Sequence, residues 1–104
     1  MEEFYQNQDI VVRFTVLKDG KPVSASSAKV PVYGPDRQFI GYGETSISGS
    51  EVRGLLKAEH VEKVGKYIFM FKVKIRNFGE QPHVVEVKVK KSPVPEKRRN
   101  KYGL

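Results

Sequence analysis

The chain has 104 residues, a formal net charge of +7 at pH 7 and no cysteine, so it is long enough for one domain but not for two of ordinary size. Without cysteine it has no disulfide framework, no thiolate nucleophile and no cysteine-based zinc site. The first residues are acidic and polar, and no apolar run is as long as a membrane span, so we expect a protein made in the cytoplasm, without a signal peptide and without a membrane partner.

The positive charge is concentrated at the C-terminal end. Residues 88–104 hold seven Lys or Arg and one Glu, a net charge of +6, whereas residues 1–87 hold twelve bases and eleven acids, a net charge of +1. Residues 92–104 contain two prolines and four bases with little to bury. We therefore expect a nearly neutral domain followed by a basic, disordered tail over residues 92–104.

The N-terminal part of the chain predicts a lead-in, a strand and a tight turn. Residues 1–8 are polar apart from Phe4 and Tyr5, which indicates a flexible lead-in or a segment that lies on a neighbouring subunit. Residues 9–17 alternate, and one face of the expected strand is apolar: Ile10, Val12, Phe14 and Val16. Asp19-Gly20 then predicts a turn, because glycine tolerates the positive φ that tight turns need.

The next segments predict weaker strands. Residues 24–28 are small and polar, typical of a loop or a weak edge strand, and residues 29–33 predict a second strand. Pro31 lacks the backbone donor of a ladder, so this second strand is expected at an edge or with a bulge. Residues 38–44 predict a third strand whose two glycines permit a bend, and residues 45–56 predict one or two short strands.

Residues 65–75 predict the central strand of the domain. Aromatic and branched side chains recur there at period two: Tyr67, Phe69, Phe71, Val73 and Ile75. Ile68 and Met70 make the opposite face apolar as well, which predicts a strand that is covered on both faces in its first half. Before it, residues 57–64 are the only helix candidate, expected as a single turn. After it, residues 83–91 alternate and predict a hairpin partner.

The aromatic residues of the central strand are expected in the core. Apolar alternation surrounds Tyr67, Phe69 and Phe71, which favours burial over a stacking platform for bases or sugars. Tyr67 follows Gly65-Lys66 at the start of the strand. It is therefore a candidate for a tyrosine corner, in which the hydroxyl group bonds to backbone at the end of a sandwich.

No catalytic, metal-binding or cofactor-binding pattern accompanies these strands. The two histidines, His60 and His83, have no metal-ligand spacing and belong to no nucleophile motif. Glu59 and Glu62 lie three apart on one turn, typical of solvated charges. The glycines of residues 34–43 flank a predicted strand instead of opening a helix, so they form no phosphate loop. We therefore expect a protein that is not an enzyme and has no cofactor.

The two chain ends hold the candidate partner-binding residues. One set is Phe4 and Tyr5, and the other lies in the tail: Lys97, Arg98, Arg99, Lys101 and Tyr102. The tail bases can neutralise a few phosphates and Tyr102 can stack on a base. A solvated tail or a linker to an assembly partner is favoured over nucleic-acid binding, because nothing basic on the folded part would extend a nucleic-acid footprint. An acidic protein surface would suit the same tail equally well.

The order of these segments resembles a known family. Residues 55–71, LLKAEHVEKVGKYIFMF, resemble the end of the immunoglobulin-like N-terminal domain of phage baseplate upper proteins, and similar small domains occur in head fibre and capsid decoration proteins. Residues 19–23, DGKPV, and residues 65–67, GKY, carry the resemblance most sharply within its span of residues 8–91. In the baseplate proteins a helical stalk and a distal module follow this domain, whereas here a short basic tail follows, so the receptor-binding role does not transfer.

The resemblance implies a single immunoglobulin-like β-sandwich over residues 9–91, with about seven strands and one short helical turn. It also implies a non-enzymatic structural protein of a tailed phage or prophage virion, either a capsid decoration or fibre-base protein or a baseplate or tail adaptor. Such a protein would be present in the host cytoplasm during assembly and then in the virion. Its partners would be capsid, tail or baseplate subunits, and homo-oligomers are compatible with this role. The alternative is a small accessory protein that binds nucleic acid through its tail.

Overall fold

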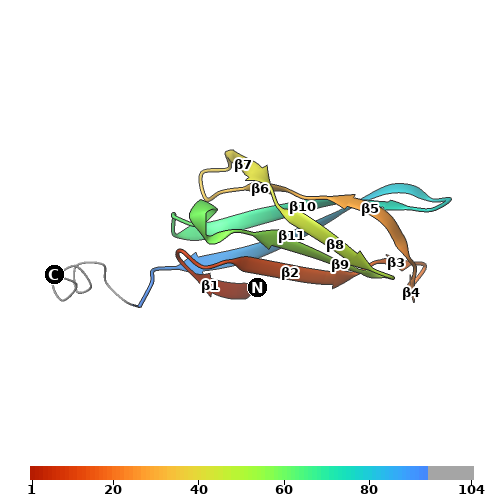
Figure 1. Ribbon diagram of the computed structural model, residues 1–104, viewed down its shortest axis with the longest axis horizontal. Helices are drawn as coiled ribbons and strands as arrows, with labels where there is room; N and C mark the ends of the chain where they lie inside the picture. Colours follow the sequence, from red (N-terminus) through yellow and green to blue (C-terminus); the bar gives the residue numbers. More distant parts are fainter. Residues whose placement is uncertain (94–104) are drawn as a thin grey trace, which may run out of the picture.

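The computed structural model describes residues 1–93, and the predicted all-β class is confirmed (Figure 1). Two main sheets and a two-stranded ribbon make up the fold. The larger sheet has six strands: β1 (Glu2–Tyr5), β5 (Ala25–Lys29), β6 (Pro31–Tyr33), β7 (Phe39–Tyr42), β10 (Gly65–Ile75) and β11 (Gly79–Lys90). The smaller sheet has three strands: β2 (Ile10–Thr15), β8 (Glu44–Ser48) and β9 (Glu51–Leu56). The ribbon consists of β3 (Leu17–Lys18) and β4 (Lys21–Pro22).

The predicted central strand, β10, lies inside the larger sheet. The strand order is β1-β11-β10-β6-β7, and β5 pairs with the end of β10 that β6 does not reach. β10 pairs with β11 along its whole length, from Gly65 opposite Val89 to Ile75 opposite Gly79. Its odd-numbered side chains from Tyr67 to Ile75 are at most 3% exposed. The predicted hairpin is confirmed, and these rings are core residues that cannot serve as a stacking platform.

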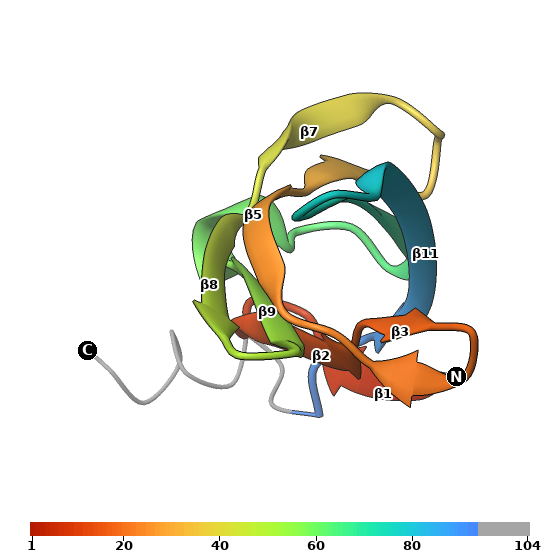
Figure 2. The ribbon, with the colours of Figure 1, turned by 90° about the vertical axis from the view of Figure 1, so that its right-hand side faces the viewer.

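The two main sheets pack face to face, with the core between them (Figure 2). The rings of Phe14 on β2 and Phe71 on β10 meet edge to face, with centroids 4.8 Å apart. Gly54 on β9 lies so close to the same ring that an added Cβ atom would stand 2.7 Å from Phe71 Cζ. The smaller sheet adds its own buried side chains to this core: Ile10, Val12, Val52 and Leu56.

The predicted turn at Asp19-Gly20 is confirmed. Asp19 and Gly20 both have positive φ, 53° and 78°, and they close the β3–β4 ribbon.

The chain passes from the larger sheet to the smaller one at Gly43, between β7 and β8. Gly43 is one of the two glycines expected to permit a bend in the third predicted strand. The Gly43 N–H donates to the Val30 carbonyl oxygen at 2.9 Å, and an added Cβ atom would stand 2.9 Å from Val30 Cγ1. A larger residue would therefore not fit where the chain changes sheets.

One N-terminal segment differs from its prediction. Residues 1–8 were expected to lie outside the sandwich as a lead-in, but Glu2–Tyr5 forms β1 and pairs in parallel with residues 87–90 of β11. The partner strand supplies ladder hydrogen bonds that the polar sequence did not reveal. Residues 24–28 were expected as a loop or a weak edge strand, and β5 is an edge strand whose only ladder partner among the described residues is β10.

The segment around Pro31 is interrupted as expected but is not at an edge. β6 lies between β10 and β7, and Val30 separates it from β5. Pro31 occupies the first position of β6, a place in a strand where proline is tolerated.

Residues 57–64 form the single expected turn, a 3-10 helix over Ala58–His60. Within residues 1–93, no helix is long and apolar enough to cross a membrane.

Candidate interaction surface

The outer face of the larger sheet is apolar at its centre. Even-numbered side chains of β10 point away from the core, because neighbouring residues of a strand point to opposite faces. Met70 is 37% exposed and lies directly across from Val84 on β11, which is 51% exposed. Ile68 is half-buried beside them and pairs with Tyr33 on β6. The prediction of a strand covered on both faces is therefore wrong, because no described element lies over Met70.

Aromatic side chains continue this face to the sheet edge. Phe39 on β7 pairs with Tyr33, so both rings lie on the outer side with Ile68. The Tyr33 and Phe39 ring centroids are 5.9 Å apart, and those of Phe39 and Tyr42 are 5.3 Å apart. Phe39 is 52% exposed and Tyr42 is 68% exposed. We call this set the outer apolar face: Tyr33, Phe39, Tyr42, Ile68, Met70 and Val84.

Three lysines flank the outer apolar face. Lys72 follows Met70 on the same side of β10 and lies directly across from Lys29 on β5. Lys74 is the next outward residue along β10. Within the described residues none of the three has a carboxylate within ion-pair distance, unlike Lys66, which pairs with Glu86 at 3.4 Å. We call Lys29, Lys72 and Lys74 the lysine cluster.

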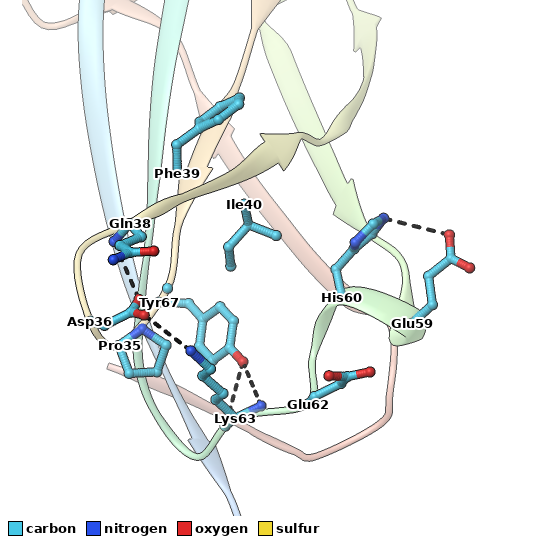
Figure 3. A pocket seen from close by; sticks show the side chains of 11 residues that line it. Pro35, Asp36, Gln38, Phe39, Ile40, Glu59, His60, Glu62, Lys63 and Tyr67 are labelled. Atoms are coloured by element: carbon cyan, nitrogen blue, oxygen red, sulfur yellow. Dashed lines mark hydrogen bonds and ion pairs between the residues drawn. The ribbon is translucent and has the colours of Figure 1, made fainter.

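A separate cleft of about 260 Å³ opens at one end of the sandwich, between residues 34–40 and residues 59–63 (Figure 3). Ile40 and the ring of Tyr67 lie on one side, and the turn that carries His60 and Glu62 lies on the other. The cleft therefore combines apolar side chains with charged groups of both signs, among them Glu62 and Lys63.

Tyr67 forms the predicted tyrosine corner at this cleft (Figure 3). Its hydroxyl group donates to the Lys63 carbonyl oxygen at 2.7 Å and accepts from the Lys63 N–H at 3.1 Å. Burial raises the pKa of Tyr67, so the hydroxyl stays protonated and keeps its role as a donor. The corner fixes the loop before β10, which makes Tyr67 a structural residue.

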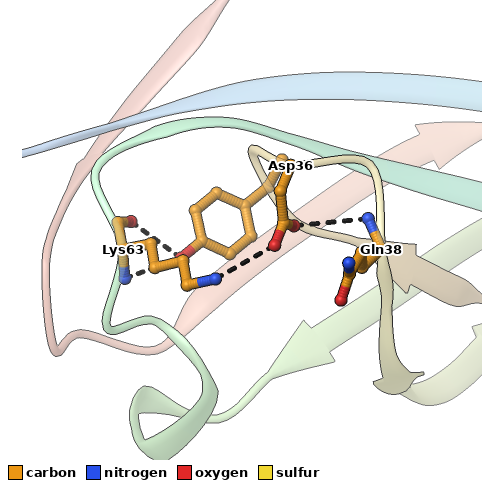
Figure 4. A network of polar contacts seen from close by, with 4 residues as sticks. Asp36, Gln38 and Lys63 are labelled. Carbon is orange, nitrogen blue, oxygen red and sulfur yellow. Dashed lines mark hydrogen bonds and ion pairs between the residues drawn. The ribbon is translucent and has the colours of Figure 1, made fainter.

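Asp36 and Lys63 at this cleft also bond within the protein. Lys63 Nζ lies 3.0 Å from Asp36 Oδ2, and the Gln38 N–H donates to Asp36 Oδ1 at 3.3 Å (Figure 4). The hydrogen bond from Lys63 lowers the pKa of the Asp36 carboxyl group. These contacts join the β6–β7 loop to the segment before β10, so Asp36 and Lys63 support the architecture of the cleft.

The two histidines lie in different surroundings. His60 Nε2 is 3.5 Å from Glu59 Oε1, and its side chain is 46% exposed. His83 stacks on Phe14 with ring centroids 4.0 Å apart and an interplanar angle of 14°, and burial lowers its pKa. Within the described part of the chain, no three His, Asp or Glu side chains form a group that could hold a metal ion.

The partner-binding residues predicted at the N-terminus lie on β1. Phe4 is half-buried and packs against the core, so it contributes to the sandwich. Tyr5 is 39% exposed, and Lys90 Nζ lies 5.4 Å from its ring centroid while pairing with Glu3 at 2.8 Å. The predicted residues of the tail lie outside the described residues: Lys97, Arg98, Arg99, Lys101 and Tyr102.

The sequence contained a signal for the outer apolar face. Ile68 and Met70 are apolar on the side of β10 that faces away from the core, and sequence reasoning assigned that side to a covering element. The register between β6 and β7, which brings Phe39 onto the same side, could not be read from the sequence.

No protein-family model matches the chain, and a comparison with curated proteins finds no match. Support for a function therefore comes from the surface of the domain and from the resemblance of residues 8–91.

Proposed function

We propose that this protein is a non-enzymatic structural component of a tailed-phage or prophage virion and acts by docking on other proteins. Its position would be that of a capsid decoration or fibre-base protein, or of a baseplate or tail adaptor. It would be present in the host cytoplasm during assembly and then in the virion. The virion assignment rests on the resemblance of residues 8–91, and the docking assignment rests on one observation, the outer apolar face.

The proposal includes an immunoglobulin-like sandwich. The smaller sheet has the order β2-β9-β8, and it faces a sheet in which β11, β10 and β6 are neighbours. Seven-strand immunoglobulin-like domains divide their strands between two sheets in a comparable way. The Tyr67 corner near the start of β10 is a second feature that supports this assignment.

Exposed rings on a rigid sheet favour docking for a physical reason. Contiguous apolar patches on monomers are small, and larger ones rimmed by polar groups mark interaction sites. Phe39 and Tyr42 are more than half exposed, so most of their apolar surface remains in water in the isolated chain. Aromatic residues on a preformed strand lose little side-chain entropy on binding and commonly dominate binding energy.

Mass spectrometry of gradient-purified particles tests the virion assignment. We expect peptides of this chain in particles from the producing host, at a constant ratio to the major capsid or tail subunit. Host proteins of similar abundance serve as the control for carry-over. Absence of the chain from clean particles would contradict the proposal.

A gel-shift assay tests the alternative that depends on the charge of the C-terminal end. Residues 88–104 carry a net charge of +6, which is the observation that favours nucleic-acid binding. A salt-sensitive shift that disappears when residues 92–104 are removed, together with absence from particles, would replace the virion proposal with the accessory role.

A further inference from the structure

We propose that the outer apolar face docks on a protein surface that has an apolar centre and acidic residues opposite the lysine cluster. This inference rests on the docking role proposed above and adds the chemistry of the partner. It does not depend on whether that partner belongs to a virion.

Apolar and charged side chains occupy successive rows across the larger sheet. One row contains Phe39, Tyr33 and Ile68, which follow one another across β7, β6 and β10. The next outward residue of β10 is Met70, beside Val84. Lys72 and Lys74 come after it along β10. The charged cluster therefore borders the apolar rows on a continuous sheet surface, and one partner can contact both.

The arrangement of the lysine cluster favours an acidic partner. Lys29 and Lys72 are directly opposed residues of adjacent strands, an arrangement that destabilises a sheet when the charges are alike. Glu80 lies directly across from Lys74 on β11, but no described carboxylate is within ion-pair distance of the cluster. A partner carboxylate would therefore relieve the repulsion between Lys29 and Lys72 as it binds. Complementary charges at a rim also fix the orientation of a complex and speed association.

Charge argues against a second copy as the occupant. The charged residues on this outer face are six lysines and three glutamates: Lys29, Lys66, Lys72, Lys74, Lys88, Lys90, Glu3, Glu80 and Glu86. Lysines lie at both ends of the face, since Lys66 and Lys88 are paired residues at the end opposite the lysine cluster. Either orientation of two facing copies would therefore bring an excess of positive charge together, which disfavours self-pairing.

The shape of the apolar rows argues against nucleic acid. A base-stacking site needs open ring faces in succession. Here the ring planes of Phe39 and Tyr42 are inclined by 71° in an edge contact, and Ile68, Met70 and Val84 have no rings. A mixture of aliphatic and aromatic side chains suits the core of a protein interface.

Site-specific crosslinking in the cells that natively make the protein tests the inference. A photo-crosslinking phenylalanine analogue replaces Phe39, and a carbodiimide couples lysine amines to carboxylates at contact distance in the same preparation. We expect one discrete protein adduct from position 39. We also expect peptides that join Lys72 or Lys74 to Asp or Glu of that same protein.

Charge-reversal variants supply the matched comparison. The double variant Lys72→Glu, Lys74→Glu should lower the yield of the position-39 adduct about tenfold, because the rim would then repel an acidic partner. The control is Arg13→Glu, Arg53→Glu, the same change in net charge on exposed, directly paired residues of β2 and β9 in the other sheet. We expect the control to change the yield by less than about twofold.

Several results would overturn the inference. They are an adduct with a second copy of this chain, an adduct with nucleic acid, no adduct from position 39, or an adduct without carboxylate links to the lysine cluster. The virion proposal fails separately. A chain that is present in purified particles but gives no position-39 adduct refutes only the inference, and an adduct with an acidic partner from a chain absent from particles refutes only the virion role.

Discussion

The two faces of β10 carry similar apolar residues but in opposite surroundings. On the inner face, Phe69 and Phe71 are fully buried between the two sheets. On the outer face, Met70 is 37% exposed, although it lies between those two rings in the sequence. Folding accounts for the inner face, because burying a large side chain contributes about 1.5–3 kcal/mol. It does not account for the apolar residues of the outer face that remain in water, which the proposed docking role would bury.

Truncation of a buried ring on the inner face of β10 should produce the largest loss of stability. We expect Phe71→Ala to lower the free energy of unfolding by about 3–5 kcal/mol, because it removes a buried ring and leaves a cavity. Urea unfolding followed by circular dichroism measures the change. Met70→Ala, one residue away on the outer face, is the control and should cost about 1 kcal/mol or less. Equal costs for the two variants would show that both faces of β10 belong to the folding core.

An added methyl group against the Phe71 ring should produce the next largest loss of stability. Gly54→Ala places a methyl group where the structure leaves 2.7 Å to Phe71 Cζ. We expect a loss of about 1–3 kcal/mol in unfolding free energy, because the ring must move within a packed core. The control is Ser46→Ala, at an exposed position of β8. A neutral Gly54→Ala variant would indicate free space between the sheets.

Removal of the Tyr67 hydroxyl group tests how much the tyrosine corner contributes to stability. Tyr67→Phe deletes the donor to the Lys63 carbonyl oxygen and the acceptor for the Lys63 N–H. We expect a cost of about 1–2 kcal/mol, because two backbone groups lose a buried partner. Tyr42→Phe on the exposed face should leave stability unchanged. A neutral Tyr67→Phe variant would show that the corner does not contribute to stability.

The smallest expected effect is a dependence of protein stability on pH through His83. Burial against Phe14 lowers the pKa of His83 in the folded state, so the unfolded chain binds the proton more readily. The stability linked to this residue is full above the unfolded pKa of about 6.5 and is lost as the pH falls through the folded pKa. We expect His83→Gln to weaken the acid dependence of the melting temperature. The same dependence in the variant and the unmodified protein would contradict this assignment.

Period-two patterns predicted the inner face residue by residue. The alternation from Tyr67 to Ile75 located the buried side chains, because one apolar face of a strand is a local property of the sequence. The Tyr67 corner was also predictable, since it needs only a tyrosine at the start of a strand that follows a tight loop. The single turn before β10 followed from a segment too short for an independent helix.

The outer face depended on long-range pairing that sequence reasoning could not supply. Gly41 and Gly43 interrupt the alternation around Phe39, so the side on which the ring lies is set by the register of β7 with β6. The lysine cluster arises only when β5 pairs with β10, which places Lys29 beside Lys72 although they are far apart in the chain. Net charge was nearly zero over residues 1–87 and gave no sign of this local segregation.

The amount of a Phe39→Ser, Tyr42→Ser variant in purified particles tests the docking role of the outer face most directly. Both side chains are more than half exposed, so we expect an unfolding free energy within about 1 kcal/mol of the unmodified protein. We predict that particle-bound variant falls to below about a tenth of the unmodified level, as expected for loss of two aromatic anchors. A normally folded variant that occupies particles at the unmodified level would contradict the account.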